Sequence, residues 1–387
     1  MTPSPMTDAP HMPNTPEARR AGAVLTVDLD AVVSNWKTCA AQSSTAECGA
    51  VVKATSYGVG AERIAPALQN AGCETFFVAT IDEGINLRGI LGGTLDQGPA
   101  IHVFNGLMDG AERDFTEFGL TPVLNSLGEL DAWRAFCTGV GKPLACNLHI
   151  DTGMSRLGMP HEEVKKIFAD PDHLTNLKLD LLLSHLAVAE DPDDPMNDAQ
   201  LAIFQLISEL FPTARASLAN SSGIFLGSPY HYDVMRPGAA LYGVNPTPND
   251  SNPMSQVVRL QAKILQVRTI DTPQSVGYGA TYKARGVERI ATIAMGYADG
   301  YHRSLSNCGV AYIGDHKAPI VGRVSMDLIT LDVSEVPEDL SRPGMLVDLI
   351  GPNNPVDDVA QAAGTIGYEV LTSLGARYHR VYVGGEV

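Results

Sequence analysis

Short runs of apolar residues recur along the first two thirds of the chain, and segments with apolar residues at helical spacing separate most of them. One strand candidate ends at Lys53, and the others span 75–80, 100–105, 122–125, 144–150, 179–185, 216–219 and 232–235. The helical segments include 62–70, 127–138, 161–168 and 198–210. Eight strands that alternate with helices predict a closed (β/α)8 barrel, and a doubly wound open sheet is the alternative.

The pattern changes after about residue 245. Residues 246–252 are rich in Pro, Asn, Asp and Ser, which is typical of a linker. Beyond it we expect one helix, over 356–363, among strands at 259–270, 291–294, 310–313, 317–321, 328–333, 345–350 and 377–383. The predicted fold is therefore α/β, with a disordered tail (1–22), a (β/α)8 TIM-like barrel (23–250) and a predominantly β domain (251–387).

Lys53 stands at the carboxyl end of an apolar strand, before a tyrosine-glycine turn at Tyr57 and Gly58. In folds of alternating strands and helices, ligands bind at that edge of the sheet. Burial lowers the pKa of a lysine, and the neutral amine is a nucleophile that forms imines, above all with pyridoxal phosphate. This stretch alone is equally compatible with a lysine whose ammonium group extends to solvent.

Further polar residues follow the later strand candidates of the barrel. Helix N-termini after the last two strands offer unpaired N–H groups to a phosphate, and an arginine facing the same cavity completes the parts of a pyridoxal phosphate site. The candidates are His149, Arg156, His185, Asn220, Ser221, Arg236, Gly238 and Ala239.

Composition narrows the function classes. A formal net charge of -17 argues against nucleic acid and anionic membranes as partners. No apolar run is long enough to span a membrane, and the first 22 residues lack the apolar core of a signal peptide, so we expect a cytoplasmic protein. Six cysteines lack metal-ligand spacing, and no metal is expected. Asp151-Thr152-Gly153 has no second copy, which excludes an aspartic protease site, and Gly58 and Gly60 lack the third glycine of a dinucleotide fingerprint.

An ordered set of motifs, covering the chain from about residue 23 to its end, resembles the alanine racemase family. No single motif is decisive, but together they are specific. They are VKA at 52–54 with YG at 57–58, HIDTGMSRLG at 149–158, SH at 184–185, NS at 220–221, RPG at 236–238, LYG at 241–243, GYGATY at 277–282, GYADG at 296–300, VGRVSMD at 321–327 and GYE at 367–369.

The resemblance implies a homodimeric fold-type III pyridoxal 5'-phosphate enzyme that interconverts L- and D-alanine, with D-alanine used in the bacterial wall. Lys53 then holds the cofactor and is the base on one face of the substrate. Tyr278, supplied by the partner subunit, is the base on the other face, with His185 and Arg236 behind it. Arg236 also faces the pyridine nitrogen. The remaining residues that match cofactor contacts are Tyr57, Arg156, Asn220, Ser221, Gly238, Ala239 and Tyr368.

The same resemblance assigns residues to the substrate. Arg156 and Met326 match the groups that meet its carboxylate, together with Tyr278. Tyr297 and Tyr368 match the inner gate of a substrate corridor, where two phenols favour a small side chain. The wider mouth of the corridor matches Glu190, Arg303, Arg323 and Ile366.

Departures from the family pattern lie close to the expected site. Where the family often has a lysine that carries a carbamate, this chain has His149, whose imidazole cannot supply a negative charge. Arg156 is therefore expected to be oriented by a bound small anion, by Asn147 or by Asp151. The others are Thr55-Ser56 for a common Asn-Ala pair, Val59 for a histidine and Ser325 for a cysteine.

Three alternatives remain open. One is an amino-acid racemase of broader specificity that also accepts serine. Another is a related fold-type III decarboxylase, although Cys308 is not in a matching motif. The last is a pyridoxal phosphate-binding protein without turnover, but such proteins are usually a barrel alone.

Overall fold

The computed structural model describes residues 15–94 and 97–385. Most of the expected disordered tail, residues 1–14, lies outside this range. The rest of it is structured: Pro16–Arg20 forms helix α1, and the side chain of Thr15 accepts a hydrogen bond from the amide of Ala18 at 3.2 Å. Lys263 Nζ donates to the carbonyls of Ala18 and Arg19, at 3.1 and 2.7 Å. The prediction of disorder through residue 22 was therefore wrong for these residues.

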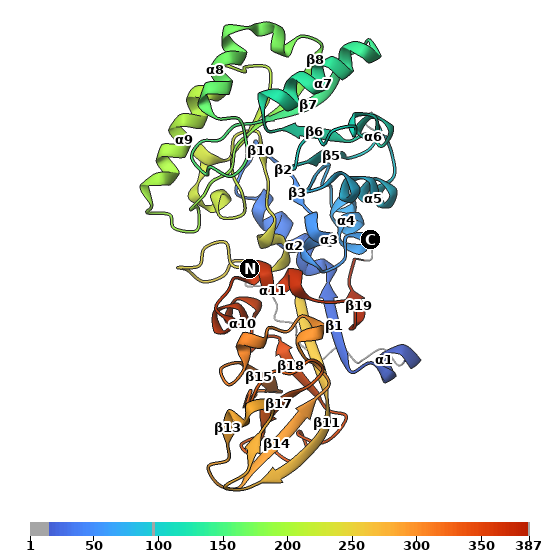
Figure 1. Cartoon of the computed structure of the whole chain (residues 1–387), viewed down its shortest axis with the longest axis vertical. Coiled ribbons are helices and arrows are strands. Elements are labelled where there is room, and N and C mark those ends of the chain that lie inside the picture. Colours follow the sequence, from blue (N-terminus) through green and yellow to red (C-terminus); the bar gives the residue numbers. More distant parts are fainter. Residues whose placement is uncertain (1–14, 95–96, 386–387) are drawn as a thin grey trace.

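Parallel strands form the barrel and confirm the predicted fold class (Figure 1). Seven of them pair in the order β3-β4-β5-β6-β7-β8-β9, and β10 pairs with β2, which continues into β3 past Gly49. Asp233 N donates to Ala216 O at 2.9 Å, so β10 is also joined to β9 and the ring closes. The bounds are β2 Glu47–Cys48, β3 Ala50–Val51, β4 Thr75–Val78, β5 Ala100–Val103, β6 Thr121–Leu124, β7 Leu144–His149, β8 Leu177–Leu183, β9 Arg215–Ser217 and β10 Val234–Met235.

Helices cover the outside of the barrel, and most begin at a side-chain cap. Asp28 caps the helix that leads into the barrel, and Ser126 caps the one that follows β6. After β9 and β10 the chain forms the short 3-10 turns η2 (Gly223–Leu226) and η4 (Ala239–Tyr242). The helices are α2 Leu29–Ala40, α4 Ala61–Asn70, α5 Ile81–Leu91, α6 Glu112–Glu117, α7 Leu127–Val140, α8 His161–Ala169 and α9 Pro195–Ser208.

The second domain is built around the long strand β11 (Val258–Ile270). Strand β1 (Ala23–Asp28) pairs antiparallel with β11 and parallel with β19 (His379–Val383), so it belongs to this sheet (Figure 1). We had expected the barrel to start at residue 23, but this strand is part of the second domain. The other strands are β12 Ser275–Val276, β13 Tyr282–Lys283, β14 Glu288–Ile293, β15 Val310–Ile313, β16 His316–Pro319, β17 Ile329–Asp332 and β18 Leu346–Ile350.

Two helices, not one, interrupt these strands. Helix α10 spans Val356–Ala363, as predicted, and α11 spans Gly367–Ser373. Ile366, at the N-cap of α11, makes no side-chain capping hydrogen bond, so the sequence carries no start signal there. Helix α11 carries Tyr368, one of the expected site residues.

A neutral histidine lies in the barrel interior. His102 is fully buried against Phe77, and its Nδ1 accepts a hydrogen bond from Asn147 Nδ2 at 2.8 Å. Its Nε2 has no hydrogen-bond partner within the part of the chain that the structure describes. Burial lowers the pKa of His102 from 6.5 to about 4, so the ring is uncharged at pH 7.

This histidine predicts acid sensitivity. Between pH 6.5 and 4 the unfolded chain binds a proton at His102 that the native chain does not, so stability is lost as the pH falls through this window. The full effect corresponds to at most about 3 kcal/mol. We expect His102→Gln, which keeps an acceptor for Asn147, to flatten that part of a urea-unfolding profile taken at pH 4.5 and 7. An unchanged pH dependence would assign the acid sensitivity to other groups.

Candidate active site

A left-handed turn follows the strand that ends before Lys53. Its φ values are 52°, 54°, 55° and 53° at Ala54, Thr55, Ser56 and Tyr57. Residues other than glycine rarely adopt this backbone conformation. No glycine marks the turn, so its conformation could not be read from the sequence. The turn places Lys53 at the carboxyl end of the barrel strands, as predicted.

Lys53 lines a cavity of about 320 Å³. The cavity brings together five residues expected from the sequence: Lys53, His149, Arg156, His185 and Arg236. It also contains residues that the sequence did not single out. The complete lining is Lys53, Ala79, Phe104, Asn105, His149, Arg156, Leu157, Leu183, His185 and Arg236.

The charges in this cavity are mostly positive. Burial and the neighbouring Arg156 guanidinium lower the pKa of Lys53, while Glu83 opposes the shift. Burial also lowers the pKa of Arg236 to about 9, which leaves it cationic at pH 7. The pKa of His185 lies well below its ordinary value, first because of burial and then because of Arg236 and Arg156. Lysine, two arginines and neutral imidazoles suit an anionic ligand.

Arg236 is held by neutral groups. Its guanidinium donates to Ser217 Oγ and to the carbonyls of Ser184 and Leu218. Within residues 15–94 and 97–385, no carboxylate lies within 4.0 Å of it. Its position is therefore fixed while its charge remains uncompensated.

Beside the cavity, a loop after β10 can hold a phosphate. Ser221 Oγ accepts hydrogen bonds from Gly238 N at 2.9 Å and Ala240 N at 3.2 Å, and keeps its own O–H to donate. A Cβ at Gly238 would lie 2.4 Å from the Tyr57 hydroxyl, so only glycine fits. The ring of Tyr57 lies 4.7 Å from that of Tyr242 and 6.3 Å from that of Tyr368. The expected phosphate contacts thus form one group.

The side chain of Asn220 forms hydrogen bonds with the backbone next to this loop. Its Oδ1 accepts from Gly223 N at 2.9 Å, and its Nδ2 lies 3.5 Å from Leu186 O. Both contacts hold the turn η2 in place. The side chain predicted as a cofactor contact is therefore engaged in shaping the loop around Ser221.

Neither protein group expected to orient Arg156 is directed at it. Asn147 Oδ1 accepts from Leu181 N at 3.0 Å, and its Nδ2 donates to His102. Asp151 Oδ1 accepts from the amides of Gly153 and Ser155, at 2.9 and 3.1 Å. The third expected means of orienting Arg156 is a bound small anion, and it stays a prediction.

The protonation of His149 follows from its neighbour. Asn125 Nδ2 donates to the carbonyls of Phe104 and Val123, so its Oδ1 is the atom that faces His149 Nδ1 at 2.8 Å. His149 must then donate from Nδ1, which leaves Nε2 as an acceptor. Burial, followed by the charge of Arg236, lowers the pKa of His149 to about 4. The sequence did not identify Asn125 as the residue that sets this tautomer.

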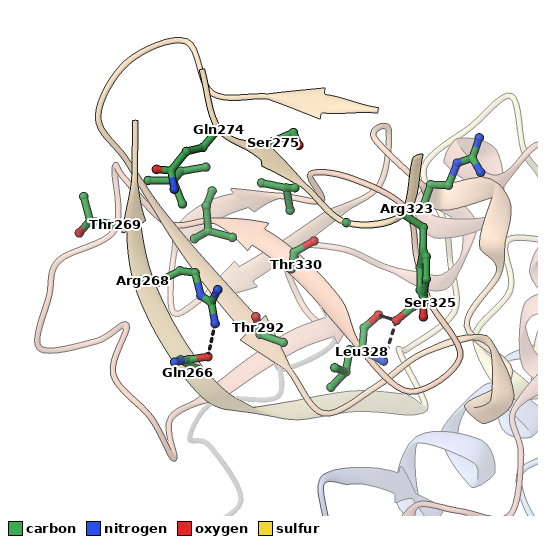
Figure 2. Close-up of a pocket in the computed structure, with 15 residues that line it drawn as sticks. Gln266, Arg268, Thr269, Gln274, Ser275, Thr292, Arg323, Ser325, Leu328 and Thr330 are labelled. Carbon is green, nitrogen blue, oxygen red and sulfur yellow. Dashed lines mark hydrogen bonds between the residues drawn. The ribbon is translucent and has the colours of Figure 1, made fainter. Parts of the chain in front are cut away.

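Tyr278 does not reach this cavity. It is 73% exposed and lines a groove of about 850 Å³ in the second domain. Arg323 and Ser325 line the same groove (Figure 2). Met326, 53% exposed, follows Ser325. These expected active-site residues therefore gather on a separate surface of the chain.

Models of two domain families match almost the whole chain. The alanine racemase N-terminal domain matches residues 27–246, and the alanine racemase C-terminal domain matches residues 257–382. The chain belongs to the alanine racemase family. The resemblance seen in the sequence motifs is thereby confirmed.

Similar proteins support this membership. An alanine racemase from Rhodospirillum rubrum is 50% identical over 369 residues, covering 94% of this chain and 97% of that protein. A catabolic alanine racemase from Mesorhizobium japonicum is 48% identical, covering 94% of each chain. The crystal structure of alanine racemase from Bartonella henselae, with covalently bound pyridoxal phosphate, has a TM-score of 0.90 at 42% identity and covers 94% of this chain and 100% of its own.

The residues expected to form a substrate corridor lie on both domains. Tyr297 begins the turn η6 (Tyr297–Asp299), and its amide donates to Ser325 O at 2.9 Å. Burial, and then the negative charge of Glu190, raise the pKa of Tyr368 on α11. Ile366 precedes α11 and is exposed, and Arg303 begins the turn η7 (Arg303–Leu305).

Proposed function

We propose that this chain interconverts L- and D-alanine with pyridoxal 5'-phosphate, using Lys53 and Tyr278 of the partner subunit as its two bases. The observation that carries the proposal is the cavity in which Lys53, Arg156 and Arg236 converge with two neutral imidazoles. D-alanine made in the cytoplasm would supply the bacterial wall.

The residues present fit the cofactor. Lys53 would hold it, the loop of Ser221 and Gly238 would bind its phosphate, and Arg236 would face its pyridine nitrogen. Pyridoxal phosphate, when bound, makes the Cα–H of an amino acid acidic enough to remove. A cation beside the ring nitrogen disfavours protonation there, which limits side reactions.

Racemisation also needs a second base. One base that returned a proton to its own side would restore the starting enantiomer. Tyr278 is exposed on the groove of the second domain and is not among the described residues that line the Lys53 cavity. Its position suits a homodimer in which each chain completes the site of the other.

Substrate size follows from the corridor. Tyr297 and Tyr368 would flank the entrance, and two phenols favour alanine, with serine as the next candidate. Met326 and Arg156 would meet the substrate carboxylate. Glu190 adds a negative charge near Tyr368, which disfavours substrates with acidic side chains.

The test uses the purified full chain with pyridoxal phosphate and L-alanine, L-serine or L-leucine. We expect loss of circular dichroism fastest with alanine, slower with serine and negligible with leucine. Comparable rates with serine would favour the broader racemase. Release of carbon dioxide would favour the decarboxylase, and visible absorbance without turnover would favour a binding protein.

His149 predicts independence from bicarbonate. A neutral imidazole at this position cannot form a carbamate, so removing dissolved carbon dioxide should leave the racemisation rate within about twofold. His149→Lys should become sensitive to bicarbonate, because a lysine there can be carbamylated. A bicarbonate-dependent rate in the unmutated chain would point to a different modified residue.

A further inference from the structure

The turn after Lys53 needs support from outside itself. Four consecutive residues, Ala54 to Tyr57, have positive φ without a glycine among them, and Thr55 is β-branched. Such backbone persists only where surrounding contacts hold it. The contacts that hold this turn therefore also decide where the Lys53 amine lies.

One carboxylate provides the contact at the start of the turn. Glu83 Oε1 accepts a hydrogen bond from Ala54 N, the amide directly after Lys53, at 2.7 Å. Its Oε2 accepts from Ala79 N at 2.8 Å and from Thr80 N at 3.3 Å. Glu83 thus joins the Lys53 turn to the end of β4 and the start of α5.

The end of the turn is held from the second domain. Arg380 donates to Gly58 O at 2.8 Å, and the Tyr382 hydroxyl donates to Val59 O at 2.9 Å. Both residues lie on β19. The turn is therefore fixed at two points, and Glu83 is the charged contact on the side of Lys53.

Glu83 lies behind the turn and outside the Lys53 cavity. It lines a second cavity of about 270 Å³ with Val52 and Thr55. Glu83 is not among the described residues that line the Lys53 cavity. Glu83 therefore cannot touch a substrate bound in the Lys53 cavity, but it can act on Lys53 through the backbone.

We propose that Glu83 is a positioning residue that holds the Lys53 amine at the cavity through the N–H of Ala54 and supplies its counter-charge. The inference rests on the proposed function of Lys53. The other groups that face Lys53 are Arg156, His149, His185 and Arg236, and each contributes a positive or a neutral charge. None of these four groups is negative, and Glu83, from behind the turn, raises the pKa of Lys53 against the effects of burial and Arg156.

The test measures Lys53 itself. The full chain without added cofactor is labelled with acetic anhydride across pH 6 to 10, and acetylation of Lys53 is followed by mass spectrometry. Glu83→Gln removes the counter-charge, so Lys53 should lose its proton at lower pH and be labelled more than about twofold faster at pH 7 than in the unmutated chain. In the loaded enzyme, kcat should fall about tenfold with KM nearly unchanged.

Thr80→Ala is the matched control. Thr80 caps α5 by accepting from Glu83 N at 3.3 Å, so its loss weakens the same helix start without removing the bond to Ala54. It should change Lys53 labelling by less than about twofold. Glu83→Asp keeps the charge but loses reach, and should lower kcat while leaving the labelling profile near that of the unmutated chain.

Two results would overturn the inference. One is a labelling profile of Glu83→Gln that matches the unmutated chain, and the other is an equal change in Thr80→Ala, which would mean that only helix stability matters. If Glu83→Gln does not fold, Glu83→Asp decides: unchanged kcat would exclude a positioning role. Labelling does not require turnover, so a failure of the proposed racemisation is distinguishable from a failure of this inference.

Discussion

Replacing Lys53 with alanine is expected to abolish the interconversion of L- and D-alanine, with a loss of at least about 10⁴-fold. The variant removes the group proposed to hold the cofactor and also one of the two bases, and a general base alone contributes roughly 10²–10⁴-fold. Lys53 suits this role because burial and Arg156 lower the pKa of its amine. Circular dichroism of alanine solutions, followed from each enantiomer, measures the loss.

The matched control is Lys37→Ala, on the exposed face of α2. It should racemise at the unmutated rate, and both variants should fold alike by far-ultraviolet circular dichroism. Residual activity of Lys53→Ala above about 1% of the unmutated rate would contradict the assignment, because no positioning effect compensates for a missing covalent and basic group.

The barrel could be read from the sequence because its signal is local. Each parallel strand is a short apolar run, and each alternates with a helical segment or a turn. Lys53, His185 and Arg236 were found for the same reason, since residues at strand ends share one edge of a barrel. The structure brings all three into one cavity.

Features set by distant contacts could not be read this way. Strand β1 has an ordinary alternating pattern, and only its pairing with β11 and β19 assigns it to the second domain. Glu83 forms a capping box with Thr80 in the structure, but its bond to Ala54 joins residues 29 positions apart, so no local pattern indicates it. The left-handed turn lacks glycine, so tertiary contacts and not local propensity decide its conformation.

Tyr278→Phe is expected to lose racemisation by at least about 10³-fold while the chain keeps the visible absorbance of bound cofactor. The variant removes the proposed base on the second face and leaves the Lys53 cavity intact, since Tyr278 lies on the groove of the other domain. Tyr282→Phe is the matched control on the neighbouring strand β13, because its hydroxyl bonds Glu288 at 3.0 Å. It should retain most activity.

Mixing the two inactive variants tests whether the site is shared between chains. If each cavity takes Tyr278 from the other subunit, a dimer of one Lys53→Ala chain and one Tyr278→Phe chain contains one complete site. Random exchange of equal amounts makes about half of the dimers mixed, so activity should return to about a quarter of the unmutated level. Each variant alone, taken through the same exchange, should stay inactive. No recovery after proven exchange would mean that Tyr278 serves the cavity of its own chain, or that it is not the second base.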